Sequence, residues 1–208
     1  ASTLERHVGK KLAHEMKTGA VGAKSGRRVN VTALFVDVEA FNARVTQEQP
    51  ESVVAYVQEW VSTVARIVDE HDGHVARVFG DSVLALWGVP DGDARDAHNA
   101  VAAGLAIVDA CAAFGVGVGI ATGDAVLATI GTSARAESVV VGEPVTLARH
   151  VEEEARATGF GLLVSEATFH GVSSTYEGAA TPPILVRGFG VPVTMYRVRP
   201  KHAQAART

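Results

Sequence analysis

The chain has 208 residues, of which 47% are hydrophobic, and its formal net charge is −4. This length is enough for one domain with a real core, and the charge gives no basic field of the kind that binds nucleic acid. The single cysteine excludes a disulfide framework within the chain, so a cytoplasmic, reducing compartment is expected. No apolar run reaches the roughly 18 residues of a membrane span, and no signal peptide opens the chain. The abrupt start would also fit the cytoplasmic domain of a larger, membrane-attached protein with sensor domains.

The first 28 residues are predicted to form a lead-in helix and a linker. Apolar residues recur every four positions from Leu4 to Met16, which is typical of one helix face. The segment TGAVGAKSGRR that follows is rich in Gly, Lys and Arg, as linkers often are. The domain itself is predicted to cover residues 29–200, with a polar tail at 201–208.

Strand-like and helix-like patterns then alternate along the domain. The β-branched run Val29–Val38 predicts a strand, and Pro50 opens a long helix that ends near Gly73. The predicted elements after it are two short strands joined at a tight turn, a helix, two strands around a turn at Gly123–Asp124, a strand, a helix and two closing strands. They correspond to HVARVFGDSVLALWG, residues 93–113, VGVGIATG and AVLATIG, SVVVG, residues 144–158, GLLVSE and PVTMYRVRP.

The order β-α-β-β-α-β is that of the ferredoxin-like split βαβ pattern. We therefore expect an α+β domain with a mostly antiparallel sheet, helices on one face, and extra strands and helices after the core. The glycines in GVGVGIATG are expected to lie in a strand and to allow close backbone packing.

Two aspartates stand in core-like hydrophobic segments. Asp37 lies within LFVDVEAF, and Asp81 lies in the tight turn FGDS between two apolar strands. In the predicted topology these strands are neighbours, so both carboxylates can converge on one point. Paired carboxylates repel unless a proton or a cation lies between them, and Mg²⁺ prefers such oxygen ligands together with substrate phosphates. Turn-capping and helix-capping roles are the alternative for each aspartate taken alone.

These segments together resemble a known family. VTALFVDVEAF, followed by GHVARVFGDSVLALWG, VGVGIATGDAVLATIG, VVVGEPVTLARHVE and LLVSEAT, is similar to the catalytic domain of class III nucleotidyl cyclases. The similarity runs from Val29 to about Pro200. Several motifs in the right order and at the right spacing are far more specific than any single motif.

The resemblance implies a mechanism and a set of site residues. Such domains pair head to tail, with nucleotide sites at the dimer interface, and two metal ions, Mg²⁺ or Mn²⁺, hold the triphosphate of the substrate. Asp37 and Asp81 match the metal-ligand positions. The backbone of Val38, Glu39, Ala40 and Phe41 would lie against the phosphates. The implied product is a 3′,5′-cyclic nucleotide, with ATP as the expected substrate.

The chain departs from the family pattern on the side that reads the base. A Lys that reads adenine and its Asp partner are replaced by Arg77 and Glu137. The guanidinium of Arg is planar and donates several hydrogen bonds in fixed directions, whereas the ammonium of Lys is compact. The preference for one nucleotide base therefore stays open. A plain surface salt bridge between Arg77 and Glu137 is the alternative.

The third predicted helix departs further. An Asn and an Arg that act on ribose and phosphates in the family correspond to Thr146 and His150, while Arg149 is about 100° away around the helix. An Arg common in the preceding strand is replaced by Gly117. The same Thr and His occur in the metal-binding half of paired, two-half cyclases. The chain is therefore expected to be weak alone, as a homodimer or as one half with a complementary partner. The alternative is a degenerate cyclase-like module that dimerises and regulates without turnover.

Overall fold

The structure is a computed structural model that describes residues 26–39, 41–132 and 135–201. The predicted lead-in helix, and most of the predicted linker and tail, lie outside these residues. The helices are α3 (Phe41–Gln47), α4 (Pro50–Glu70), α5 (Asp96–Ala110), η1 (Ala112–Phe114), α6 (Glu143–Thr158) and α7 (Glu166–Val172). The strands are β1 (Arg27–Val38), β2 (His74–Val78), β3 (Ser82–Trp87), β4 (Val116–Thr132), β5 (Arg135–Val141), β6 (Leu162–Ser165), β7 (Tyr176–Ala180), β8 (Ile184–Leu185), β9 (Pro192–Val193) and β10 (Met195–Pro200).

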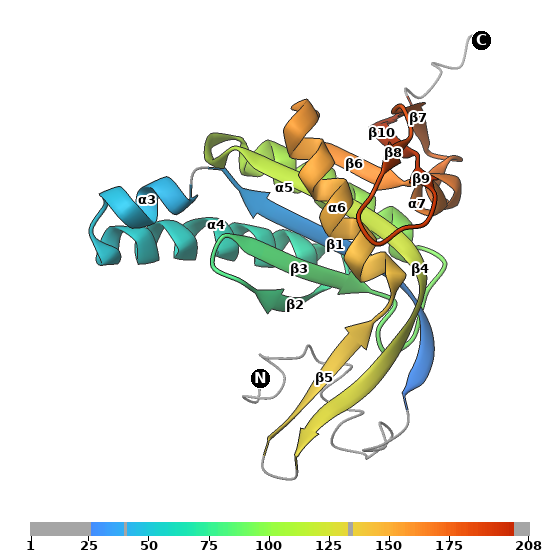
Figure 1. Cartoon of the computed structure of the whole chain (residues 1–208), viewed down its shortest axis with the longest axis horizontal. Coiled ribbons are helices and arrows are strands. Elements are labelled where there is room, and N and C mark those ends of the chain that lie inside the picture. The colour runs from blue at the N-terminus through green and yellow to red at the C-terminus, as the bar shows by residue number, and fades with distance from the viewer. Residues whose placement is uncertain (1–25, 40, 133–134, 202–208) are drawn as a thin grey trace, which may run out of the picture.

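Most of the strands form one large, twisted sheet. Its order is β2-β3-β1-β4-β6-β10-β7, with β5 paired to β4 beside this path (Figure 1). Only the β4–β6 pair in this sheet is parallel. The α+β class and the mostly antiparallel sheet expected from the sequence are confirmed.

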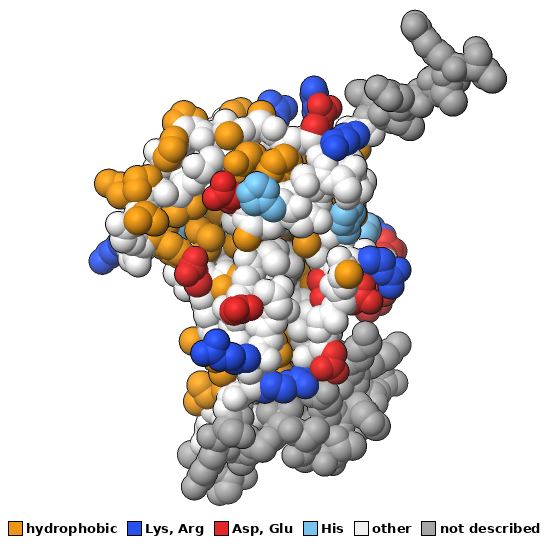
Figure 2. Space-filling model, turned by 90° about the vertical axis from the view of Figure 1, so that its right-hand side faces the viewer, with side chains coloured by type: hydrophobic (Ala, Val, Ile, Leu, Met, Phe, Trp, Pro, Cys, Tyr) orange, Lys and Arg blue, Asp and Glu red, His pale blue; other side chains and the backbone are white. Residues whose placement is uncertain are grey.

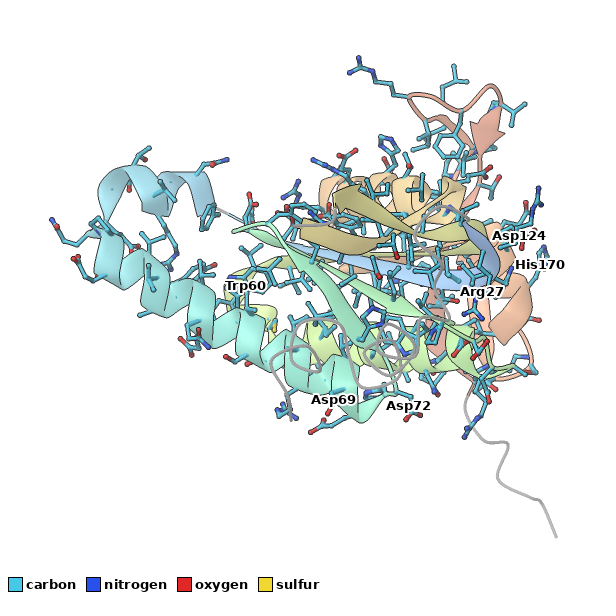
Figure 3. The ribbon with its side chains drawn as sticks, turned by 90° about the horizontal axis from the view of Figure 1, so that it is seen from below. Arg27, Trp60, Asp69, Asp72, Asp124 and His170 are labelled. Atoms are coloured by element: carbon cyan, nitrogen blue, oxygen red, sulfur yellow. The ribbon has the colours of Figure 1, made fainter. Side chains whose placement is uncertain are left out.

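The central strand β1 is buried on both faces. Leu34 and Val36 belong to the core under α4 and α5, whereas Ala33 and Phe35 belong to a second core under α6. Successive side chains of a strand point to opposite faces, so one continuous apolar run serves both cores. Trp60, on the side of α4 that faces the sheet, belongs to the first core (Figure 3).

The position of α6 differs from the expectation that all helices cover one face. α4 and α5 pack on one face, and α6 packs on the other, against β4 and β1. Glycines in β4 permit this close contact, because a Cβ on Gly119 would lie 2.1 Å from the backbone nitrogen of Glu152 and 2.2 Å from the carbonyl oxygen of Ala148. The expected close packing of the GVGVGIATG strand is therefore confirmed, and its partner is α6.

The predicted turn at Gly123–Asp124 is wrong. β4 runs without a break from Val116 to Thr132, and its pairing with β1 is continuous from Val116 to Leu127. Twelve consecutive partners on β1 hold the two residues in an extended conformation, which overrides their local preference for turns. Beyond β1, β4 and β5 form an arm that extends away from the body of the domain (Figure 1).

Short elements escaped prediction because they have too few residues for a periodic pattern. They are α3, η1, α7, β7 and the small β8–β9 hairpin, whose second strand, β9, takes the first two residues of the predicted closing strand. None of the helices within the described ranges combines the length and apolar character needed to cross a bilayer.

Candidate active site

Asp37 lies one residue before the end of β1, on the side of the strand that carries Phe35 and faces α6. Its partners in register are Ser82 of β3 and Gly117 of β4, so the carboxylate lies at one end of the sheet between two neighbouring strands. The side chain is 18% exposed. Asp37 is therefore a half-buried charge that solvent can still reach.

The turn between β2 and β3 brings Asp81 to the same place. Gly80 has a φ of +80°, a left-handed conformation that glycine adopts readily. The backbone N–H of Val38 donates to the carbonyl oxygen of Asp81 at 3.1 Å, which fastens the turn to the residue after Asp37. Burial raises the pKa of the Asp37 carboxyl above its ordinary value, the Arg156 guanidinium opposes this, and the charge of Asp81 adds to it. Asp81 is thus close enough for its charge to act on Asp37.

This pair of aspartates fits a hard divalent cation. Within the described ranges no group of three or more His, Cys, Asp or Glu side chains could hold a metal ion by itself. Mg²⁺ commonly binds through one or two carboxylates and completes its shell with water and substrate phosphates, so two aspartates are enough. A cationic group already lies on Asp37, since Nη1 of Arg156 donates to Oδ1 at 2.5 Å. The chemistry of the donor set and this cationic contact both agree with a metal site completed by a triphosphate.

Arg156 and Glu152 are site residues that the sequence reasoning missed. Both lie in the C-terminal half of α6, and the side chain of Glu152 is only 3% exposed. Its Oε1 is 3.6 Å from Nε of Arg156, close enough for an ion pair but too long for a hydrogen bond, and it has no other partner among the described residues. Burial raises the pKa of Glu152 to about 7, against the opposing charge of Arg156.

A signal for Glu152 was present in the sequence. Ala148, Val151 and Ala155 form the buried stripe of α6, and Glu152 falls within it at helical spacing. The side chain fits because β4 has a glycine below it: a Cβ on Gly117 would lie 2.7 Å from Oε1 of Glu152. Gly117 therefore leaves room for a buried acid.

The predicted base-reading residues also meet. Arg77 pairs in register with Leu84 on the α6 face of the sheet, and its Nη2 donates to Oε1 of Glu137 on the β4–β5 arm. The guanidinium lies 5.9 Å from the ring centroid of Phe79. Arg77 lines an open pocket of about 240 Å³ whose apolar part includes Leu84, Leu86, Leu127 and Val140. Both sequence-based alternatives, a base-reading pair and a surface salt bridge, remain compatible with this contact.

Thr146, at the start of α6, does not lie next to the aspartates, whereas Arg149 is near enough for its charge to oppose the raised pKa of Asp37. Thr146 and Arg149 are exposed, and the side chains of Arg149 and His150 both contact Glu153, at 3.5 and 2.9 Å. Thr146 is about 15 Å along the helix axis from Arg156, at 1.5 Å per residue. One chain therefore holds the aspartates and Thr146 as two separate groups.

The segment after Asp37 turns sharply into α3. The backbone N–H of Glu39 donates to the carbonyl oxygen of Gly115 at 3.0 Å, and Phe41 is the first residue of α3. Ala40 lies outside the described residues. Val38, Glu39 and Phe41 thus lie at the same end of the sheet as the aspartates.

The sequence of this chain is similar to one known family and to several bacterial proteins. The family described as "Adenylate and Guanylate cyclase catalytic domain" matches residues 23–199. "Adenylate cyclase 1" of Rhizobium meliloti (strain 1021) is 30% identical over 178 residues, which cover 79% of this chain and 27% of that protein. An uncharacterised protein of Mycobacterium tuberculosis (strain ATCC 25618 / H37Rv) is 32% identical over 176 residues, 82% of this chain and 32% of that protein. The chain thus spans about a third or less of these relatives' length.

Solved structures show the same fold. The adenylyl cyclase CyaB from P. aeruginosa superposes with a TM-score of 0.78 at 22% identity, covering 85% of this chain and 97% of that one. The guanylyl cyclase Cya2 superposes with a TM-score of 0.73 at 27% identity, covering 83% and 93%. With its family match, its relatives and this shared fold, the chain belongs to the class III adenylate and guanylate cyclase catalytic-domain family.

Proposed function

We propose that this domain converts a nucleoside triphosphate, ATP in preference, into a 3′,5′-cyclic nucleotide and pyrophosphate. The observation that carries the proposal is the convergence of Asp37 and Asp81 at one end of the sheet, held by the Val38–Asp81 backbone hydrogen bond. The adenylate cyclase relative supports ATP as the substrate. The 30% sequence identity to this relative does not by itself decide between ATP and GTP, because a guanylyl cyclase has the same fold.

In this mechanism Asp37 and Asp81 would hold two divalent cations, Mg²⁺ or Mn²⁺. When bound, such ions activate the attacking oxygen and neutralise charge on the leaving group. The backbone from Val38 to Phe41 orients the phosphates. The ribose 3′-oxygen forms a bond to the α-phosphorus, and the bond from that phosphorus to the oxygen that bridges to the β-phosphorus breaks. Pyrophosphate leaves, and the 3′-hydroxyl proton passes to water.

The separation of the two groups within one chain supports a site shared between two domains. Asp37 and Asp81 of one domain would face Arg77, Glu137 and the start of α6 of another. The face that carries α6 and the β8–β9 hairpin has exposed apolar side chains, as contacts between domains require. Leu185 is 78% exposed and Val191 is 67% exposed, and Figure 2 shows hydrophobic side chains gathered on this side of the molecule.

The start of α6 supports a weak enzyme. Thr146 and His150 cannot donate as an Asn and an Arg would, and loss of one transition-state donor typically costs on the order of 10²–10³ in rate. The same residues favour a second candidate function, a regulatory module that binds nucleotide and dimerises without turnover. In either case we propose that the domain works in the cytoplasm as one part of a longer signalling protein.

A turnover assay separates the two functions. The purified chain is incubated with Mn²⁺ and each of ATP, GTP, CTP and UTP, and the cyclic products are measured by chromatography. Enzymatic function predicts slow cyclic product from one purine nucleotide and its loss in Asp37→Ala. If no nucleotide gives product, or Asp37→Ala leaves the rate unchanged, the proposal of catalysis fails for this chain.

A further inference from the structure

Arg156 makes a direct contact with the proposed metal ligand. Its Nη1 donates to Oδ1 of Asp37 at 2.5 Å, joining residues 119 positions apart in the chain. Hydrogen bonds between two charged groups are shorter and stronger than neutral ones. The contact therefore uses the carboxylate that the proposed reaction needs for its metal.

The guanidinium and a divalent ion cannot both use this carboxylate fully. A Mg²⁺ ion lies about 2.1 Å from its ligand oxygen, so an ion on Oδ1 of Asp37 would be within about 4.6 Å of Nη1 of Arg156. Like charges at that distance repel strongly in a half-buried site. An ion on the other oxygen would still share a single negative charge with the arginine.

Of the groups at this contact, the arginine side chain is the one that can leave. The backbone of α6 is fixed, because it packs directly on Gly119 of β4. Asp37 is set in the sheet by its register, and Glu152 is buried. The side chain of Arg156 is 40% exposed and has a long, flexible stem, so it can turn toward solvent without disturbing the helix.

We infer that Arg156 is the internal counter-ion of Asp37 and that a divalent cation must displace it to bind. Arg156 is thus a positioning residue: it keeps Asp37 paired in the metal-free domain and lowers the domain's affinity for metal. After displacement the guanidinium remains tethered beside the site, where the negative charge of a triphosphate offers it a new partner. The inference rests on the proposed function only in taking Asp37 as a metal ligand.

Metal binding without nucleotide tests this directly. Free Mn²⁺ is measured by electron paramagnetic resonance during titration of the whole chain and of Arg156→Met, which keeps an unbranched apolar stem but removes the charged guanidinium. We expect Arg156→Met to bind Mn²⁺ about fivefold more tightly, the magnitude of a partly exposed ion pair. Arg66→Met is the matched control, because Arg66 pairs with Glu70 on the exposed side of α4, and it should bind Mn²⁺ as the unaltered chain does.

The possible results distinguish failure of the proposed role of Arg156 from failure of the proposed metal site. Equal or weaker Mn²⁺ binding by Arg156→Met, with binding still lost in Asp37→Asn, overturns the role of Arg156 and leaves the metal site standing. Absence of Mn²⁺ binding in all proteins overturns the counter-ion role alone, because a metal site completed by a triphosphate can still serve the proposed reaction. Binding that Asp37→Asn does not reduce overturns both. Thermal melting followed by circular dichroism checks that each variant is folded, and Arg156→Gln serves if the methionine variant is not.

Discussion

Glu152→Gln should stabilise the domain at high pH and much less at low pH. Burial raises the pKa of Glu152 from 4.5 to about 7; Arg156 and Arg149 oppose this rise, and Asp37 and Glu153 add to it. Between these two pH values the folded domain keeps a proton that the unfolded chain has released, so stability falls as pH rises through this range. The pKa difference corresponds to about 3 kcal/mol lost above pH 7. Glutamine keeps the shape of the side chain and carries no charge at any pH.

Urea unfolding at pH 5 and pH 8 measures this difference. The free energy of unfolding of Glu152→Gln minus that of the unaltered chain should be about 1 kcal/mol at pH 5 and about 3 kcal/mol at pH 8. Glu59→Gln is the control, because Glu59 is exposed on α4, and its effect should be within about 0.5 kcal/mol at both pH values. If Glu152→Gln has the same effect at both pH values, Glu152 does not hold a proton in the folded domain and the account of its burial is wrong.

Three further predictions address packing, metal binding and the transition state. Gly119→Ala should destabilise the domain by about 3 kcal/mol or more in urea unfolding, because the new Cβ would overlap the backbone of α6, whereas Gly190→Ala, with nothing within 4 Å, should be close to neutral. Asp81→Asn should reduce Mn²⁺-dependent cyclisation on the order of 100-fold or more while leaving the melting temperature nearly unchanged, and full activity in this variant would remove Asp81 from the metal site. Thr146→Asn with His150→Arg should raise the rate of cyclisation on the order of 100-fold if the pocket is otherwise complete, and an unchanged rate would show that the start of α6 does not limit it.

Much of the fold could be predicted because its signals are local and periodic. The helix that begins at Pro50 and the strand that ends at Val38 have strong apolar patterns, and both are present in the structure. The turn expected at Gly123–Asp124 failed because pairing with β1 determines the conformation there, and that partner is about 90 residues away in the sequence. The face of the sheet on which α6 packs could not be predicted either. It depends on which face of β4 lacks side chains at its glycines, such as Gly119.

Some residues of the candidate site could be predicted from the sequence and others could not. The aspartates could be found because a carboxylate in an apolar strand is conspicuous, and the pairing of β1 with β3 then brings them together. Arg156 could not be found, because an arginine on the exposed side of a helix is ordinary in sequence. Its contact with Asp37 depends on the exact position of α6 over the sheet.

The chemistry of the site follows from the charge balance around Asp37. Asp37, Asp81 and the buried Glu152 supply up to three negative charges, and Arg156 is the cation in direct contact with Asp37. Gly117 leaves room for this arrangement, because a Cβ there would lie 2.7 Å from Oε1 of Glu152. The positive charge beside Asp37 thus comes from a side chain of α6 and not from the strands of the sheet. The end of β1 therefore carries more negative than positive charge and attracts cations. In the arrangement that we infer, a metal ion binds there when it displaces Arg156 from Asp37.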